Sequence, residues 1–285
     1  MADDADFFVR FWGVRGSIAC PGAPWARYGG NTSCLEVRCG QQLLIFDGGT
    51  GLRVLGKQLK PETPINADIF FTHTHLDHIG GVPFFMPLFE KQNRFNLWAG
   101  HLSCDKPAGE PMTLKDVFRK MMAKPLFPVP VDVFKAKISY RDFKVGETLT
   151  PRPGVTIRTA KLKHPDDATG YRVEFGDRSI CYVTDTEHDA NAGTRDSNVV
   201  ELIRDADIFI YDCTYTDEEY PRFEKWGHST WEEGVRLADA AKAKTLVIFH
   251  HDPSHDDDTM DRIGEAAARQ RPGTLVAREG MILRP

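Results

Sequence analysis

The chain has 285 residues, of which 41% are hydrophobic and 27% are charged, a composition typical of a globular protein and not of a disordered one. Its formal net charge is −5, from 36 Lys and Arg against 41 Asp and Glu, so it has no general electrostatic attraction for nucleic acid. No stretch approaches the roughly 20 apolar residues of a membrane helix, and the acidic residues 1–6 do not begin a signal peptide. We therefore expect a soluble cytoplasmic protein without membrane contact.

The six cysteines form no C-x-x-C pair, and we expect most of them to be reduced and buried. Length and the absence of a linker, low-complexity run or short repeat favour one domain over residues 1–285.

Short apolar or alternating segments predict strands in the first third of the chain, and glycine-rich turns end several of them. The expected strands are 7–12, 34–39, 43–46 and 69–71. The turns include 13–17 and 47–51, and a helix should run from Leu52 to about Leu59, before Pro61 and Pro64.

The segment 84–137 is rich in proline and aromatic residues, and we expect it to be an insertion with one helix at 114–122. It could cover a cleft, supply a homodimer contact or belong to the core. Seven basic residues between Phe84 and Phe134 could favour an anionic substrate, although a solvated face is the simpler explanation. They are Lys91, Arg94, Lys106, Lys115, Arg119, Lys120 and Lys124.

Strands and helices recur in the second half of the chain. The expected strands are 155–157, 171–175, 180–183, 208–211, 246–249, 275–277 and 281–283, and the helices are 198–204, 230–243 and 259–269. Ser229 or Thr230 should cap the second of these helices, with Glu232 and Glu233 as capping-box partners. The two similar series predict an α/β fold in which two sheets are sandwiched between helices.

The strongest chemical signal is the run from Thr72 to Gly81. It places His73, His75, Asp77 and His78 within six positions, directly after an apolar strand. Residues two apart in a loop can project the same way, so His73 and His75 can hold one ion while Asp77 and His78 reach a second. Imidazole and carboxylate are ligands of Zn²⁺ and related metals, and solvated histidines do not explain such density.

This motif, His-x-His-x-Asp-His after a strand, resembles the signature of the metallo-β-lactamase superfamily. Such proteins fold as a four-layer αββα sandwich with one or two metals at the edge where the sheets meet. The resemblance spans the chain from Phe7 to Met281 and implies further ligands in a fixed order. His164 and Asp185 fit two of them; His250 and His251 both fit the last, and His250 follows its strand directly.

The resemblance therefore implies two cations and a water-derived hydroxide between them as the nucleophile. His73, His75 and His164 would hold the first, and Asp77, His78 and His250 the second, with Asp185 bridging. Zn²⁺ fits these ligands best, but the residue types also allow Mn²⁺ or Fe. Asp47, in the glycine-rich turn, is expected to order the loop and not to bind metal.

Gly227-His228-Ser229-Thr230 resembles the His-Ser-Thr loop of the phosphodiesterase branch, which includes tRNase Z and phosphodiesterases related to PhnP. There the histidine steadies a phosphoryl oxygen or protonates the leaving oxygen, so we assign catalysis to Asp77 and His228. Alternatively, His228 is a bystander and Ser229 and Thr230 only cap the helix.

Further residues could support this site. Glu187 and His188 could orient His228, or they could be solvated loop residues. The loops 11–17 and 29–33 resemble the opening of the same branch, and Ser17, Asn31 and Ser33 could donate hydrogen bonds there; tight turns between strands are the simpler explanation.

These residues favour a metal-dependent phosphodiesterase. The tRNA-trimming members carry a long arm that, in the bacterial form, lies between the third histidine and the bridging aspartate, but Asp185 follows His164 by only 21 residues. We expect a small substrate, such as a cyclic nucleotide or cyclic ribose phosphate, and not a large nucleic acid. The alternatives are hydrolysis of a thioester, lactone or β-lactam, a tRNase Z-like nuclease, and a binding module without activity.

Overall fold

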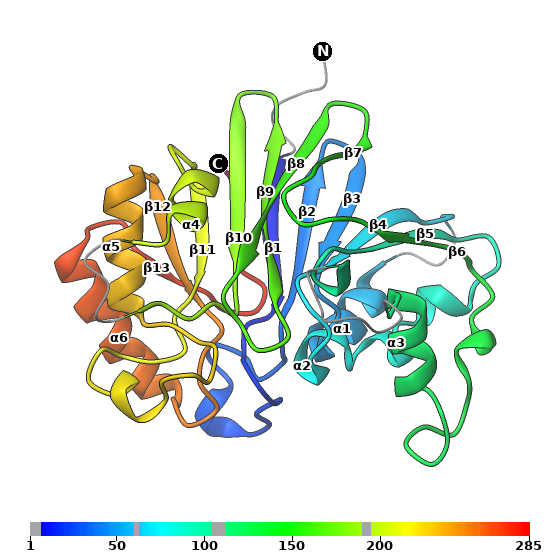
Figure 1. Ribbon diagram of the computed structural model, residues 1–285. Helices are drawn as coiled ribbons and strands as arrows, with labels where there is room; N and C mark the ends of the chain where they lie inside the picture. Colours follow the sequence, from blue (N-terminus) through cyan, green and yellow to red (C-terminus); the bar gives the residue numbers. More distant parts are fainter. Residues whose placement is uncertain (1–6, 60–62, 104–111, 190–194) are drawn as a thin grey trace.

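The computed structural model describes residues 7–59, 63–103, 112–189 and 195–285, and Figure 1 follows the chain through them. Within these residues the strands form two seven-stranded sheets. The first sheet has the order β14-β1-β2-β3-β4-β5-β6 and the second β13-β12-β11-β10-β9-β8-β7.

The strands of the first sheet are β1 (Phe7–Gly13), β2 (Cys34–Cys39), β3 (Gln42–Phe46), β4 (Asn66–Phe71), β5 (Arg94–Ala99), β6 (Lys137–Asp142) and β14 (Ile282–Leu283). Those of the second are β7 (Thr148–Arg152), β8 (Val155–Leu162), β9 (Ala168–Phe175), β10 (Arg178–Val183), β11 (Ile208–Asp212), β12 (Thr245–Phe249) and β13 (Leu275–Val276). In each sheet one half is antiparallel and the other parallel. The parallel strands β3, β4 and β10–β12 are the apolar runs that predicted buried strands, whereas β5 and β6 were not predicted.

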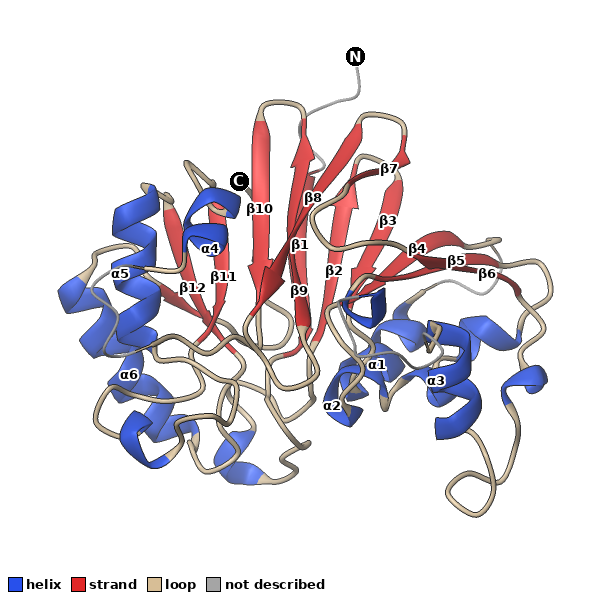
Figure 2. Cartoon of the chain, in the orientation of Figure 1, coloured by secondary structure: helices blue, strands red, loops and turns tan. Residues whose placement is uncertain are grey.

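The helices are α1 (Thr50–Gln58), α2 (Leu76–Ile79), α3 (Leu114–Met121), α4 (Ser197–Leu202), α5 (Trp231–Ala241) and α6 (Asp257–Gln270). Short 3₁₀ turns lie at Ala23–Trp25, Val82–Phe84, Met86–Phe89, His101–Ser103, Val131–Val133 and Tyr220–Arg222. In Figure 2, α1 and α3 flank the first sheet, and α4, α5 and α6 flank the second. The four-layer αββα sandwich is confirmed.

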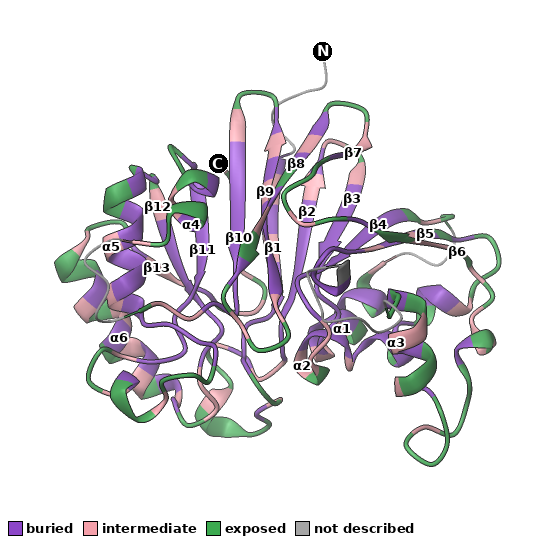
Figure 3. Ribbon diagram, viewed as in Figure 1, coloured by how far each residue is buried: buried purple, intermediate pink, exposed green. Residues whose placement is uncertain are grey.

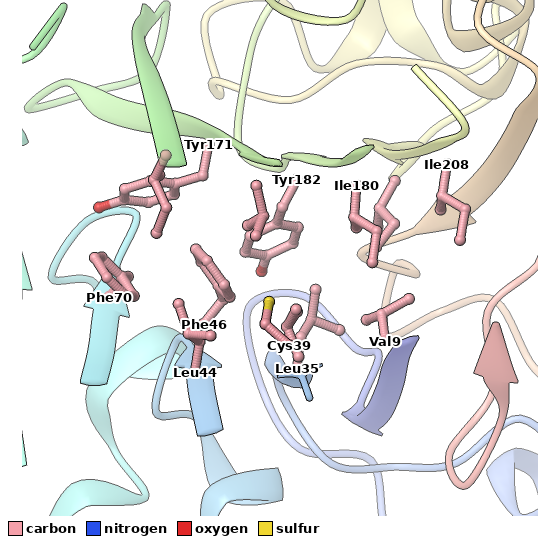
Figure 4. Packing of buried hydrophobic residues seen from close by; sticks show 14 of the residues in the cluster. Val9, Leu35, Cys39, Leu44, Phe46, Phe70, Tyr171, Ile180, Tyr182 and Ile208 are labelled. Atoms are coloured by element: carbon pink, nitrogen blue, oxygen red, sulfur yellow. The ribbon is translucent and has the colours of Figure 1, made fainter. Parts of the chain in front are cut away.

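Apolar side chains of the two sheets meet in the middle of the sandwich. Figure 4 shows Phe46 and Phe70 of the first sheet opposite Tyr171 and Tyr182 of the second. Phe46 stacks on Phe70 at 5.1 Å between ring centroids, and Tyr171 meets Phe46 edge-on at 5.3 Å. Figure 3 shows this pattern across the described residues: most strands are largely buried, and exposed residues lie mainly on helices and loops and on the outer strands such as β6.

Local hydrogen bonds move several helix boundaries by one or two residues. Helix α6 begins at Asp257 because the Asp256 side chain accepts from the Thr259 amide. Helix α5 ends at Ala241 because Lys242 is left-handed, with φ 56°. Its capping box is only half formed: the Thr230 hydroxyl accepts from the Glu233 amide, but the Glu233 carboxylate binds Arg195 and Arg236.

The segment 84–137 is built into the first layer. Its strand β5 lies between β4 and β6, and its buried aromatic residues, such as Phe85, Phe95 and Phe118, pack under the sheet. The core interpretation therefore holds for these residues. Six of the seven basic residues named between Phe84 and Phe134 are described and exposed, as a solvated face requires, and Lys106 lies outside the described residues.

Five cysteines are buried and free, as expected; Cys104 lies outside the described residues. None of the helices in the described ranges combines the length and apolar character that crossing a bilayer requires.

Candidate metal centre

The ligand residues predicted from the sequence meet at one edge of the sandwich, where strands β4, β8, β10 and β12 end (Figure 1). His73 and His75 follow β4, and Asp77 and His78 lie in the short helix α2 that comes next. His164, Asp185 and His250 follow β8, β10 and β12. Loops leaving strand ends at one sheet edge converge, which brings residues that are distant in sequence to one place.

His73, His75 and His164 form the first cluster, with one nitrogen from each within 4.8 Å of the others. His164 Nε2 and His75 Nδ1 are 3.0 Å apart. His73 Nε2 is buried and has no hydrogen-bond partner. A buried nitrogen without a partner is costly unless a cation accepts its lone pair, so this trio fits a metal ion.

Asp77, His78, Asp185 and His250 form the second cluster within the same distance. Asp185 Oδ2 lies 3.3 Å from His78 Nε2 and 3.2 Å from His250 Nε2. Its other oxygen, Oδ1, lies 3.6 Å from His73 Nε2 in the first cluster. Asp185 thus presents one oxygen to each cluster, which is the arrangement a bridging ligand needs.

The far nitrogens of four imidazoles are held by the protein. The Nδ1 atom of His78 donates to Asp47 at 2.9 Å, and that of His164 donates to the Gly227 carbonyl at 2.7 Å. The Nδ1 atoms of His73 and His250 lie 3.1 and 3.0 Å from the hydroxyls of Thr72 and Thr214. These contacts leave Nε2 of each ring to face the clusters, as second-layer partners do at metal sites.

Asp47 lies outside the clusters as an ordering residue. Besides His78, it accepts from the Thr72 amide and hydroxyl and from the Tyr182 hydroxyl, so it ties the histidine loop to both sheets.

The structure distinguishes His250 from His251. His250 joins the second cluster, whereas His251 Nε2 donates to the Ala277 carbonyl at 2.8 Å. Burial lowers the pKa of His251 to about 3, so it stays neutral in this hydrogen bond. His250 has a left-handed backbone, with φ 61°, which turns the chain as it leaves β12.

The protonation states and negative charges of the site also favour cation binding. Burial lowers the pKa of His73, His75 and His164, which keeps these imidazoles neutral and able to bind metal. Burial by itself would raise the pKa of Asp185, but the nearby His250, His78 and His73 hold it well below its usual range. Asp47, Asp77 and Asp185 thus concentrate negative charge around His78, and divalent cations would neutralise it.

Asp212, at the end of β11, was missed in the sequence. Its Oδ2 accepts from His228 Nδ1 at 3.0 Å, and although burial opposes it, this carboxylate raises the pKa of His228 to about 9. The His228 ring stacks on His250 at 4.9 Å, beside the second cluster. The signal was an acidic residue ending an apolar strand, the same pattern that identified Asp185.

The other residues predicted to support the site make contacts that differ from those expected. Glu187 accepts from the Gly227 amide at 2.9 Å, and His188 Nδ1 lies 2.8 Å from the Ser229 hydroxyl, so they hold the two neighbours of His228 and not its ring. The Ser17 amide, not its hydroxyl, donates to Asp77 Oδ2 at 2.8 Å. Asn31 donates to Glu279, away from the clusters, and Ser33 is buried.

Comparison with known proteins places this site in a family. Residues 43–251 match the Beta-lactamase superfamily domain. A curated relative, Ribonuclease Z of Haloarcula marismortui, is 23% identical, with 88% of this chain and 90% of that protein covered.

Two solved structures share the fold over nearly their whole length. A diphosphatase from the PhnP family has a TM-score of 0.68 at 21% identity, covering 97% of each chain. Zn²⁺-bound PqqB from Methylobacterium extorquens has a TM-score of 0.71 at 17% identity, covering 97% of this chain and 99% of that one. Because the matched segment covers most of the chain and contains both ligand clusters, the protein belongs to the β-lactamase superfamily.

Proposed function

We propose that the protein is a metal-dependent phosphodiesterase that hydrolyses a small phosphodiester. The observation that carries this proposal is the pair of ligand clusters sharing Asp185, with the Asp212–His228 pair directly beside them. The clusters suit two cations, and the pair supplies a proton donor that ester hydrolysis at phosphorus requires.

When bound, two divalent cations supply Lewis acidity at the phosphoryl oxygens and a water of near-neutral pKa. Asp77 keeps an ionised carboxylate at the second cluster, since Ser17, His78 and His250 all contact its Oδ2, and this carboxylate takes up the proton of the attacking water. His228 stays protonated at neutral pH because of Asp212. Its Nδ1 faces Asp212, so its Nε2 donates a proton to the departing alkoxide oxygen.

Two Zn²⁺ ions are the proposed cofactors. Five imidazole nitrogens with a few carboxylate oxygens are donors that Zn²⁺ favours, and the similar PqqB structure contains Zn²⁺. Metal analysis of protein purified without chelators distinguishes zinc from manganese and iron.

A second candidate, trimming of precursor tRNA, is favoured by the curated relatives, which include several proteins named Ribonuclease Z. Against it stands the fully described interval between His164 and Asp185, which consists of the hairpin β9–β10 and the turns around it. It contains no additional arm that could hold a tRNA. The protein's negative charge also opposes the many phosphate contacts of a large RNA.

A direct assay separates these functions. Purified protein is incubated with bis-p-nitrophenyl phosphate, a thioester, nitrocefin and a precursor tRNA, with and without added Zn²⁺ or Mn²⁺. We expect metal-dependent release from the phosphodiester alone, and its loss in Asp185→Ala. Turnover of the thioester or nitrocefin alone would reject the proposal, and cleavage of the tRNA at its 3′ end would favour the second candidate.

We also propose action in the cytoplasm, supported by the five free buried cysteines, and a homodimer formed through the segment 84–137. This segment carries five of the nine large exposed apolar side chains of the described residues, namely Phe84, Met86, Met112, Leu126 and Val129. Light scattering after size-exclusion chromatography measures the oligomeric state.

A further inference from the structure

A row of aromatic rings leads from His228 to the protein surface. Tyr215 meets the His228 ring edge-on, with centroids 6.1 Å apart. Phe223 stacks on Tyr215 at 4.4 Å with an interplanar angle of 7°. Trp226 then meets Phe223 edge-on at 5.5 Å. The row therefore connects the proposed proton donor with an indole at the surface.

Backbone hydrogen bonds keep this row in place. Tyr215 pairs with the loop that carries His228, because its amide donates to the Ser229 carbonyl and its carbonyl accepts from the Trp231 amide. The Trp226 amide donates to the Phe223 carbonyl at 3.1 Å. The backbone of Tyr215 is thus tied to the His228 loop, and that of Trp226 to Phe223.

Trp226 is exposed in a way that packing does not explain. It is 61% exposed, whereas Trp12 and Trp231 are each 7% exposed. A ligand that covers an exposed indole removes a large apolar area from water, and this favours binding. Exposed tryptophans beside reactive groups are therefore typical of binding sites.

The chain segment that carries Trp226 also borders a cavity. Its chain neighbours Lys225 and Gly227 line a cavity of about 470 Å³ that reaches His164 of the first cluster. The cavity wall carries both lysines and carboxylates, among them Lys163 and Glu187, which form an ion pair at 3.7 Å. Mixed charges suit a neutral polar group, such as a sugar, better than a second phosphate.

We propose that Trp226 is a stacking platform for a planar heteroaromatic ring on the leaving group of the diester, such as the base of a nucleoside. This inference rests on the proposed function. Because His228 donates its proton to the leaving oxygen, the leaving group lies on the side of the site where the aromatic row begins. Stacking accepts any base, since every base has a π face.

Binding of two phosphomonoesters tests the platform without turnover. Adenosine 5′-monophosphate and ribose 5-phosphate share the sugar and phosphate and differ by the base. Calorimetry on the Zn²⁺-loaded protein should show that the first binds about 5- to 150-fold more tightly, the range that stacking of one base gives. It should also quench the Trp226 fluorescence, whereas ribose 5-phosphate should not.

The variants are Trp226→Ala, Trp226→Phe and, as a control at another exposed apolar position, Ile282→Ala. Trp226→Ala should remove the preference for the nucleotide and leave the affinity for ribose 5-phosphate unchanged. Trp226→Phe should keep part of the preference but lose the quenching, and Ile282→Ala should match the unaltered protein. An equal loss of both affinities in Trp226→Ala, or no preference in the unaltered protein, would overturn the inference.

The same measurements separate this inference from the proposed function. A Trp226-dependent preference in a protein that cleaves no phosphodiester would support the platform and reject the phosphodiesterase. Cleavage of bis-p-nitrophenyl phosphate without a preference for the nucleotide would support the phosphodiesterase and reject the platform.

Discussion

At the scale of single residues, the Asp212–His228 pair supplies the proton that we propose for the leaving group. A buried histidine is normally neutral because burial disfavours its charged form. At His228 the carboxylate 3.0 Å from its Nδ1 outweighs this burial effect and stabilises the imidazolium. The same edge of the sheets thus holds His73, His75 and His164, whose pKa burial lowers, together with a protonated imidazole for acid catalysis.

Asp212→Asn should therefore move the alkaline limb of the rate profile. With Asp212 present, the pKa of His228 is raised to about 9, so the proton donor is lost only as the pH rises through that value. Without the negative charge the pKa should fall toward 6.5, the ordinary value of histidine, and kcat/KM should decline from a lower pH. Rates on bis-p-nitrophenyl phosphate from pH 6 to 10 measure the shift. Glu265→Gln, at an exposed surface pair, is the control and should keep the original profile.

At the scale of elements, the turn after β1 positions ligands that it does not itself supply. Arg15 is fully buried and donates to the carbonyls of Gly29 and His255 at 2.8 and 2.6 Å. This anchor lays Gly16 against the His250 ring, where an added Cβ would come within 2.4 Å of Cε1. The next residue, Ser17, donates its amide to Asp77. The turn therefore holds two members of the second cluster.

Gly16→Ala should weaken the second cation selectively. The methyl group must displace the His250 ring, and disturbing the support of a ligand typically costs 10- to 100-fold in metal affinity. Metal analysis after dialysis against a weak chelator should find one cation per chain in place of two. Ser17→Ala keeps the amide that binds Asp77 and should retain both. Two tightly bound cations in Gly16→Ala would contradict this role of the turn.

At the scale of the whole molecule, an ion pair between a buried aspartate and a partly buried arginine joins the two sheets near β4 and β7. Asp68 of the first sheet is fully buried and accepts from Asn96 and Trp98 at 2.8 Å each, and from Arg152 of the second sheet. The negative charge of Asp68 is thus balanced by an arginine from the opposite sheet, and this contact links the two sheets.

Arg152→Ala should lower the free energy of unfolding by about 3–5 kcal/mol, because it leaves Asp68 buried without its cation. Urea unfolding followed by circular dichroism measures the loss. Arg158→Ala, which breaks the exposed pair with Glu174, should cost about 0–1 kcal/mol. Equal costs for the two variants would show that the inter-sheet pair contributes no more than a surface pair.

Much of this fold and site could be predicted because the signals are local. Apolar runs marked the parallel strands β3, β4, β10, β11 and β12, but not β5 and β6, and the dense motif after β4 marked His73. Asp185 and His250 were assigned through the family resemblance, which implies an order of ligands along the chain. Asp212 also lies at the end of an apolar strand but was not recognised, because nothing in the sequence indicates that its carboxylate pairs with His228. Its partner His228 lies 16 residues further along the chain, beyond the 3₁₀ turn Tyr220–Arg222. The two side chains therefore meet only when the loops are folded.

The sequence by itself determined the alternation of strands and helices and the kinds of donor atoms at the strand ends, because hydrophobic periodicity and residue chemistry are properties of short segments. Only the tertiary structure decided that His250 and not His251 faces the second cluster, that the Ser17 amide reaches Asp77, and that an aromatic row links His228 to Trp226. Each depends on how strands from two sheets are ordered and on the turns between them, and no single segment contains that information.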